Sequence, residues 1–336
     1  MKSSNELLSQ LLTKMKKGHP SLKESYGSPS RGVAAPMNEA FVIDQAKYDA
    51  LVKEDPRSAE ILRPFVEAND IKRWRVEPRG LWLIFTPKGK LDINDYPAVK
   101  RHLLPFREQL ENRAAGQQWF ELEEAQSAIA QTMAEPKIGF SGMADQPSFH
   151  MDVTGTFFGE DSSFISSADY YLAGLLNSAT YRLLLTAGMP DGSNELQIQH
   201  IGSLPVPDAG GFQRGDIGRY ADFCHRKVKD RLDLIAHFRG MTAHNLSSGG
   251  AGSTLSDKLT SWFFLDFATF REEVINTFGQ DIPQDDLELW ENYLEQEKQQ
   301  VMKINAEIVN AEYQIEKVIY EIFGLTEDEI ALIERT

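Results

Sequence analysis

The chain has 336 residues, of which 41% are hydrophobic and 25% charged, as expected of a soluble globular protein with a sizeable core. No apolar run approaches the roughly 20 residues of a membrane-spanning helix, and the first 20 residues are too polar for a secretory signal. The single cysteine, Cys224, excludes an intramolecular disulfide and predicts a cytoplasmic location.

The net charge of −15 is distributed unevenly. Residues 281–336 hold 15 acidic and 4 basic side chains, whereas residues 71–113 hold 10 basic and 5 acidic ones. Residues 1–35 are also basic, with 6 Lys or Arg against 2 Glu. Binding to DNA requires local cations that neutralise phosphates, so the total charge does not exclude it.

The first 113 residues predict alternating helices and strands. A helix over residues 4–17 should end at Gly18 and Pro20. The expected elements that follow are a strand "EAFVID", a helix capped by Asp44, a helical "SAEILRPFVE", a central strand "LWLIFTP" and a helix over 96–113 bent at Pro105.

From residue 137 the apolar pattern changes to a period of two. The segments "KIGFSG", "SFHMDVTG", "TFFGED" and "SSFISS" predict a small antiparallel meander. Residues 168–186 predict one long apolar helix, and "LQIQHIGSLPVP" predicts a strand ended by prolines. The Phe residues at 157, 158 and 164 are expected in the core.

After Pro207 the sequence is almost wholly helical. Helices are expected over 216–239 and 256–278, with a Gly- and Ser-rich linker between them. The last long helix has a seven-residue apolar repeat, which predicts a coiled-coil seam. Its positions are Leu287, Leu294, Val301, Ile308, Ile315 and Ile322, with Trp290, Ile304, Ala311 and Val318 between them. Gly324 should end this helix, and "TEDE" at 326–329 is a capping box.

Motifs for catalysis are absent from the sequence. It has no phosphate-binding P-loop, no H-E-x-x-H, no cysteine pair for zinc and no nucleophile elbow. It also lacks the N-P-P-[YF] loop of amino-methyltransferases and a glycine-rich loop for S-adenosylmethionine. Cys224 and His225 lie in a charge-rich helical pattern, which favours a structural cysteine. We therefore predict no catalytic residue and no metal site in this chain.

Eight segments, in order, carry a resemblance to a known family. They are "RGVAAPMNEAFVID", "SAEILRPFVEANDIKRW", "LWLIF", "YPAVKRHLLPFREQLENR", "WFEL", "PKI", "YYLAGLLNS" and "IGSLPVP". Residues 25–207 thus resemble the TaqI-like C-terminal specificity domain, the target-recognition module of type IIG restriction–modification enzymes and of PglX-like adenine DNA methyltransferases. Ala35 and Pro36 stand where that family has Thr-Gly.

The resemblance implies a part in phage defence. In the family the module follows a catalytic domain that flips an adenine and methylates its amino group. This chain has no such domain, so the resemblance implies double-stranded DNA and a methyltransferase or nuclease as partners. No cofactor is expected in this chain; S-adenosylmethionine, with or without Mg²⁺, would belong to the missing catalytic part.

Two surfaces are candidates for DNA contact. The first is a basic hairpin with Lys72, Arg73, Arg75, Arg79, Lys88 and Lys90, where Trp74 and Trp82 supply rigid apolar bulk. The second is the meander, with Lys137, Ser141 and His150 as weaker candidates. The segment 31–44 has two interpretations. It is a scaffold whose Phe41 and Ile43 face the core, or Arg31 and Asn38 contact DNA directly.

The predicted fold is α+β: an N-terminal helix and linker (1–24), a target-recognition domain with a mixed sheet (25–207) and a helical region (208–336). The predicted function is sequence-specific recognition of duplex DNA that directs adenine methylation or cleavage. The alternatives are an interaction subunit that uses its acidic helices, and an acidic DNA mimic that blocks defence enzymes. The seam also leaves a homodimer through the last helix open.

Overall fold

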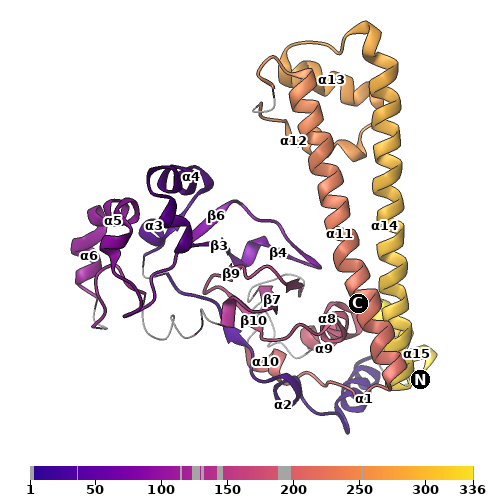
Figure 1. Ribbon diagram of the computed structural model, residues 1–336. Coiled ribbons are helices and arrows are strands. Elements are labelled where there is room, and N and C mark those ends of the chain that lie inside the picture. The colour runs from indigo at the N-terminus through magenta and orange to yellow at the C-terminus, as the bar shows by residue number, and fades with distance from the viewer. Residues whose placement is uncertain are drawn as a thin grey trace. The chain divides into compact units, whose positions relative to one another are not determined.

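A computed structural model describes residues 4–35, 37–113, 116–122, 129, 132–141, 147–187, 198–250 and 253–335. The fold is α+β, as predicted: small mixed sheets come first, and long helices of 36 and 37 residues follow (Figure 1). The chain forms two compact units, and unit 1 is discontinuous, with residues 1–221 and 315–336. Unit 2 comprises residues 222–314. The predicted boundaries at residues 24 and 207 divide the sequence differently and stay a prediction.

Unit 1 contains two four-stranded sheets. The first has the order β1 (Ser30–Arg31), β10 (Ser162–Ile165), β7 (Lys137–Ser141) and β8 (Phe149–Asp152), with all pairs antiparallel. The second has the order β2 (Val42–Ile43), β6 (Leu81–Ile84), β3 (Leu62–Val66) and β9 (Phe157–Phe158). The strand at 81–84 is central in its sheet, as its apolar faces predicted.

The predicted meander is correct for β7, β8 and β10 but wrong for β9. This strand leaves the first sheet and pairs in parallel with β3, with Phe65 opposite Phe157. Both of its phenylalanines are at most 2% exposed, because the strand lies where the two sheets meet. Phe164 is buried as well, so the three phenylalanines are core residues, as expected.

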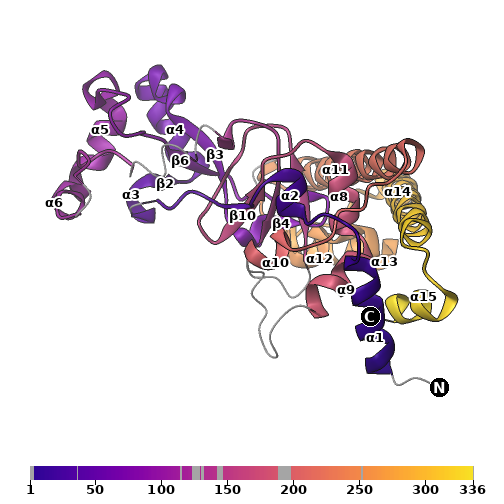
Figure 2. The same cartoon turned by 90° about the horizontal axis from the view of Figure 1, so that it is seen from below.

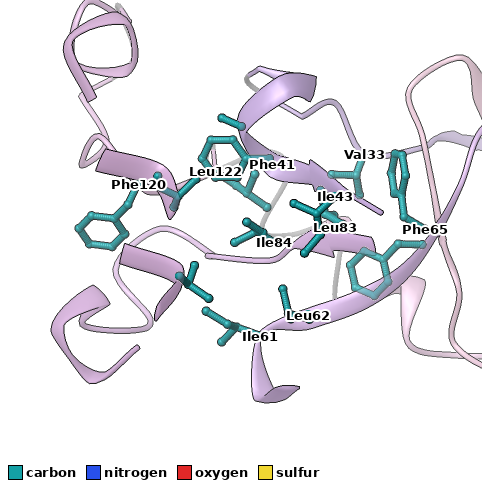
Figure 3. Close-up of a cluster of buried hydrophobic side chains, with 14 of the residues drawn as sticks. Val33, Phe41, Ile43, Ile61, Leu62, Phe65, Leu83, Ile84, Phe120 and Leu122 are labelled. Atoms are coloured by element: carbon teal, nitrogen blue, oxygen red, sulfur yellow. The ribbon is translucent and has the colours of Figure 1, made fainter. Parts of the chain in front are cut away.

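The segment 31–44 is a scaffold built on a close backbone contact. Gly32 donates its N–H to the Ser162 carbonyl at 2.9 Å, and a Cβ at Gly32 would lie 2.1 Å from the Gly159 oxygen. The predicted strand "EAFVID" is wrong in its first half, since Asn38–Phe41 form a helical turn (α3) and only Val42–Ile43 extend. Phe41 and Ile43 face the core, as predicted (Figure 3).

The next helices surround this core. α4 (Gln45–Glu54) begins at its predicted cap, where the Asp44 carboxylate accepts the Lys47 N–H at 2.7 Å. The expected helix "SAEILRPFVE" is instead a 3-10 turn over Pro56–Glu60 followed by β3, because Leu62 to Phe65 pair with β6. α5 (Pro97–Leu103) and α6 (Arg107–Glu111) are separated at Pro105, as predicted.

The predicted long helix 168–186 is two helices, α8 (Tyr170–Asn177) and α9 (Ala179–Ala187). Ser178 between them is extended, with φ −74° and ψ 154°, and its hydroxyl accepts the Tyr181 N–H at 3.1 Å. The predicted strand at 196–207 is wrong at Ile198–Gly202, which form a helical turn (α10), whereas Pro205 makes an antiparallel bridge with Ser21. Residues 188–197 lie outside the described part.

Unit 2 consists of helices. Most of α11 (Gly211–Leu246) and α14 (Leu287–Phe323) lie in it side by side (Figure 1), joined through α12 (Asp257–Thr260) and α13 (Phe267–Phe278). The predicted helix 256–278 is broken by a 3-10 turn at Trp262–Phe264. This break places the Trp262 indole on the Phe238 ring, with 4.0 Å between centroids.

The heptad seam of α14 is buried against the same chain. Its buried members are Trp290, Leu294, Val301, Ile308, Ala311 and Ile315. In unit 2 the seam packs on α11, where the Cys224 thiol contacts the Ile308 carbonyl and Lys227 pairs with Glu307 at 2.7 Å. The seam is thus covered within one chain and gives no reason for a homodimer, which stays untested.

The C-terminal helix of the chain packs beside the N-terminal helix. α14 ends at Gly324, which has φ +58°, and the predicted capping box of Thr326 and Glu329 starts α15 (Glu327–Glu334). α1 (Ser4–Lys16), found where it was predicted, lies beside α15 (Figure 2). Lys14 donates to Glu329 and to the Gly324 carbonyl, each at 2.7 Å.

Candidate nucleic-acid interface

The predicted basic hairpin exists and is short. β4 (Ile71–Lys72) pairs with β5 (Arg75–Val76), and Lys72 lies opposite Arg75. Arg73 and Trp74 form the turn. Trp74 has φ +65°, a left-handed conformation that bulky side chains rarely adopt. Its side chain is 3% exposed and its N–H donates to the Phe149 carbonyl at 3.1 Å, so the turn is fixed on β8.

Two of the hairpin arginines already have carboxylate partners. Arg75 donates through Nε to Glu77 at 2.8 Å, and Arg79 donates through Nε to Asp70 at 2.7 Å and through Nη2 to Glu67. The hydrogen bonds that Arg79 donates to Asp70 and Glu67 raise its pKa. Each carboxylate partner offsets the positive charge of its arginine. The folded hairpin therefore presents less positive charge to a phosphate than its count of Lys and Arg residues suggests.

Three predicted cations have no ion-pair partner among the described residues. Arg31 on β1 and Lys90 after β6 are exposed, and Lys72 is half-buried. Lys88 is half-buried and already makes a polar, ring or electrostatic contact within the protein. Arg31, Lys72 and Lys90 are therefore the cations of the predicted set most available to phosphates.

Lys137, one of the residues predicted to contact DNA, is buried and paired in this structure. Its side chain is 0% exposed, and its ammonium donates to Asp152 at 2.5 Å and to the Met133 carbonyl at 2.6 Å. Burial lowers the pKa of Lys137. Burial acts to raise the pKa of Asp152, but the Lys137 charge and the hydrogen bonds from Thr154 outweigh it, so this pKa is lowered. A fully buried, paired ammonium holds the core and cannot reach DNA in this conformation.

The other candidates lie apart from one another. His150 on β8 is half-buried and opposite Gly139, and Ser141 is buried at the end of β7. Arg31 lies on β1, at the opposite edge of the same sheet from His150. Asn38 is exposed at the start of α3, and its carbonyl accepts the Val42 N–H. The structure therefore brings only Lys72 and Arg75 together as a strand pair.

An open pocket of about 390 Å³ lies near the turn of Lys88 and Lys90. Its lining includes Lys100, Arg107 and Trp119, and the Arg107 guanidinium lies 5.5 Å from the Trp119 ring centroid. Asp92 and Glu121 also line it, so the two cations are balanced by two acids. This pocket offers no net charge for a phosphate.

In the described part of the chain, no three His, Cys, Asp or Glu side chains lie close enough to hold a metal ion. None of the helices described is long and apolar enough to cross a bilayer. Sequence reasoning overlooked two polar residues at the α8–α9 junction, Asn177, which bonds the Phe149 backbone, and Glu316, which bonds Ala179 and Thr180. The only signal for Asn177 was a lone amide within an apolar helix.

Comparisons with known proteins give three findings. Residues 212–319 match the model of a family described as a domain of unknown function (DUF8810), and these residues enclose unit 2. No curated protein matches the chain.

Among solved structures, the chain is similar to one described as "Structure of Type IIL restriction-modification enzyme MmeI in complex with DNA has implications for engineering of new specificities". The identity is 12% and the TM-score 0.49, over 91% of this chain and 34% of that protein. This chain therefore spans about a third of the length of that protein.

Proposed function

We propose that this chain is a target-recognition module that binds duplex DNA at a specific sequence. It would direct adenine methylation or cleavage by a catalytic domain or subunit that this chain does not contain. S-adenosylmethionine would bind that catalytic part. The proposal follows from the family resemblance of residues 25–207, and the folded structure supports it in one respect.

The supporting observation is that the resembling segments bind one another. In "YYLAGLLNS", the Tyr171 hydroxyl donates to the carbonyl of Pro207, at the end of "IGSLPVP", at 2.8 Å. Val42 of "RGVAAPMNEAFVID" pairs with Leu83 of "LWLIF" in antiparallel strands. The Leu122 N–H of "WFEL" donates to Thr86, directly after "LWLIF", at 2.8 Å. Residues that resemble the family in sequence thus form the contacts of a single fold, which is what a shared domain requires.

Salt-dependent binding tests the DNA part of this proposal. Each phosphate contact contributes about −0.9 to the slope of log affinity against log salt. Replacing Arg31, Lys72 and Lys90 with Ala together should flatten the slope by up to about 3 if all three contact phosphates. Fluorescence anisotropy on short duplexes across a salt series measures this.

The matched control replaces Lys23, Lys47 and Lys53, three exposed lysines with no ion-pair partner among the described residues. This control removes the same charge, so it should leave the slope nearly unchanged if the three proposed cations form the interface. Equal effects of both triple variants would mean that only net charge matters. Absence of binding to any duplex at low salt would refute the proposed function.

Exposed apolar side chains on α14 favour a second function, protein interaction through the acidic helices. Leu289, Met302 and Val309 are each about two-thirds exposed, at 65%, 66% and 65%. A partner helix with an apolar stripe and basic flanks would suit this acidic surface. In that case the chain should bind a protein partner at salt concentrations that abolish DNA binding, and a Met302→Asp and Val309→Asp variant should lose that partner.

A further inference from the structure

Glu316, near the end of α14, binds the beginning of α9. Its carboxylate accepts the Ala179 N–H, the Thr180 N–H at 3.4 Å and the Thr180 hydroxyl at 2.8 Å. These amides belong to the first turn of a nine-residue helix, where backbone N–H groups lack partners within the helix. Glu316 thus caps α9 from a residue that is more than 130 positions away in the sequence.

Asn177 binds the other side of the same junction. It is 6% exposed, and its amide group accepts the Phe149 N–H at 3.2 Å and donates to the Phe149 carbonyl at 3.0 Å. The side chain therefore takes the place of a neighbouring strand along the edge of β8. Residues 177–180 are consequently held between β8 and α14.

The turn of the β4–β5 hairpin bonds the same Phe149 carbonyl as Asn177. The Phe149 oxygen accepts hydrogen bonds from both Asn177 Nδ2 and the Trp74 N–H. Trp74 is the single described non-glycine residue with positive φ, and such a conformation persists only where the surroundings hold it. The neighbouring Arg73 also acts on Glu316, since its charge favours the carboxylate.

We propose that Glu316 is a positioning residue for the β4–β5 hairpin and acts on it through the α8–α9 junction and Phe149. The inference rests on the proposed function, because it makes α14 a determinant of how Lys72 and Arg75 meet a duplex. It also adds a residue that lies outside the segment 25–207, in which the family resemblance would place recognition.

Loss of the Glu316 carboxylate should affect sequence-specific binding more than non-specific binding. Without Glu316, the Ala179 and Thr180 N–H groups lose their acceptor and only the Ser178 hydroxyl still caps α9, so the junction loosens and the strained Trp74 turn loses part of its support. Contacts with bases need fixed side-chain directions, whereas contacts with phosphates tolerate movement. Loss of Glu316 should therefore reduce affinity for the preferred sequence more than affinity for other DNA.

Hydrogen exchange without DNA tests the positioning step by itself. Glu316→Ala should speed exchange of the Trp74 and Phe149 amides by tenfold or more, while the amides of β3 and β6 keep their rates. Glu316→Gln keeps an acceptor oxygen for the α9 amides, so exchange in α9 should stay slow. The matched control, Glu321→Ala, removes an exposed carboxylate from the same helix and should change neither region.

Binding to duplexes selected from a random library by the wild-type protein tests the functional step. The ratio of affinities for selected and scrambled duplexes should fall at least tenfold in Glu316→Ala and be partly retained in Glu316→Gln. Faster exchange confined to α9, with the Trp74 amide unchanged, would reduce Glu316 to a helix cap and overturn the inference. If Glu316→Ala does not fold, the same two measurements on Thr180→Val, which removes one donor to the Glu316 carboxylate, decide it.

The two proposals fail in different ways. A wild-type protein that selects no duplex refutes the proposed function, and the exchange of the Trp74 amide still decides whether Glu316 positions the hairpin. A protein that selects duplexes, but whose affinity ratio is the same with and without Glu316, refutes the inference alone.

Discussion

At the scale of single residues, the buried Lys137–Asp152 pair shows that a charged residue can stabilise the core instead of contacting a ligand. Both side chains are at most 2% exposed. Replacing Lys137 with Met should cost about 3–5 kcal/mol of unfolding free energy, because Asp152 would remain as an uncompensated buried charge. Urea unfolding at neutral pH measures this cost.

The exposed Lys90 is the control for that experiment, and Lys90→Met should change stability by no more than about 0.5 kcal/mol. A second change, Asp152→Asn, should restore part of the stability lost in Lys137→Met. Unchanged stability in Lys137→Met, together with weaker DNA binding, would return this lysine to the interface.

Glu316 should make stability depend on pH. Burial raises its pKa above the ordinary value of 4.5, and its hydrogen bonds with Thr180 and Ala179 and the Arg73 charge offset burial only in part. A group whose pKa is raised by folding stabilises the protein fully below its unfolded pKa, and this stabilisation is lost as pH rises through the folded pKa. Glu316→Gln should remove that loss.

The measurement is urea unfolding of both proteins from about pH 4 to pH 8, around the ordinary pKa of a glutamate. Wild type should lose stability relative to Glu316→Gln as pH rises. A constant difference across this range would mean that the pKa of Glu316 is the same in the folded and unfolded states.

The residue scale also shows what the sequence could predict. Asp44 as a helix cap, and Phe41 and Ile43 in the core, follow from local pattern, and the structure confirms them. The pairing of Arg79 with Asp70 and Glu67 does not follow, because it depends on the turn that brings residues nine and twelve positions apart together. The burial of Lys137 depends on its partner across β7 and β8.

At the scale of elements, the α14 seam gives a direct test of burial. Ile308 is 6% exposed and its neighbour Val309 is 65% exposed. Ile308→Asp should destabilise unit 2 by several kcal/mol, because it places a charge in an apolar contact with α11. Thermal melting and light scattering together measure this, and the protein should keep its oligomeric state.

Val309→Asp is the matched control, with the same added charge one position along the helix. It should change stability by about 0.5 kcal/mol or less. A reversed result, with Val309→Asp changing the oligomeric state and Ile308→Asp tolerated, would mean that the exposed face of α14 is the one that binds a second copy.

Element prediction succeeded where a long periodic pattern decided the structure. The seven-residue repeat placed α14 within a residue of its observed ends, and the apolar run "LWLIF" gave the central strand. It failed for short segments with mixed signals. "EAFVID" begins with good helix formers and ends with two β-branched residues, and the structure follows each half separately. Ser178 ended a helix that its apolar neighbours would have continued.

At the scale of the whole molecule, the two ends of the chain belong to one unit. Ile333 in α15 is 1% exposed, and Lys14 of α1 pairs with Glu329. Ile333→Ala should therefore destabilise unit 1 by about 2–5 kcal/mol, as for other buried isoleucines. Hydrogen exchange should show the loss in α1 and α9, which contact α15, and not in α12 or α13 of unit 2.

Glu334→Ala, an exposed change on the same helix, serves as its control and should leave exchange in α1 unchanged. If Ile333→Ala instead loosened only α15, the ends of the chain would not stabilise each other, and unit 1 would be complete without its last residues.

The discontinuity of unit 1 has a consequence for the order of events during synthesis. A ribosome releases residues 222–314 before residues 315–336, so all of unit 2 leaves the exit tunnel before unit 1 is complete. Until then the first 221 residues lack α15, the Glu316 cap and the partner of Lys14, and the apolar residues Leu11 and Met15 of α1 are without part of their cover. Unit 1 is translated first but completed last, so it should depend on chaperones for longer than unit 2.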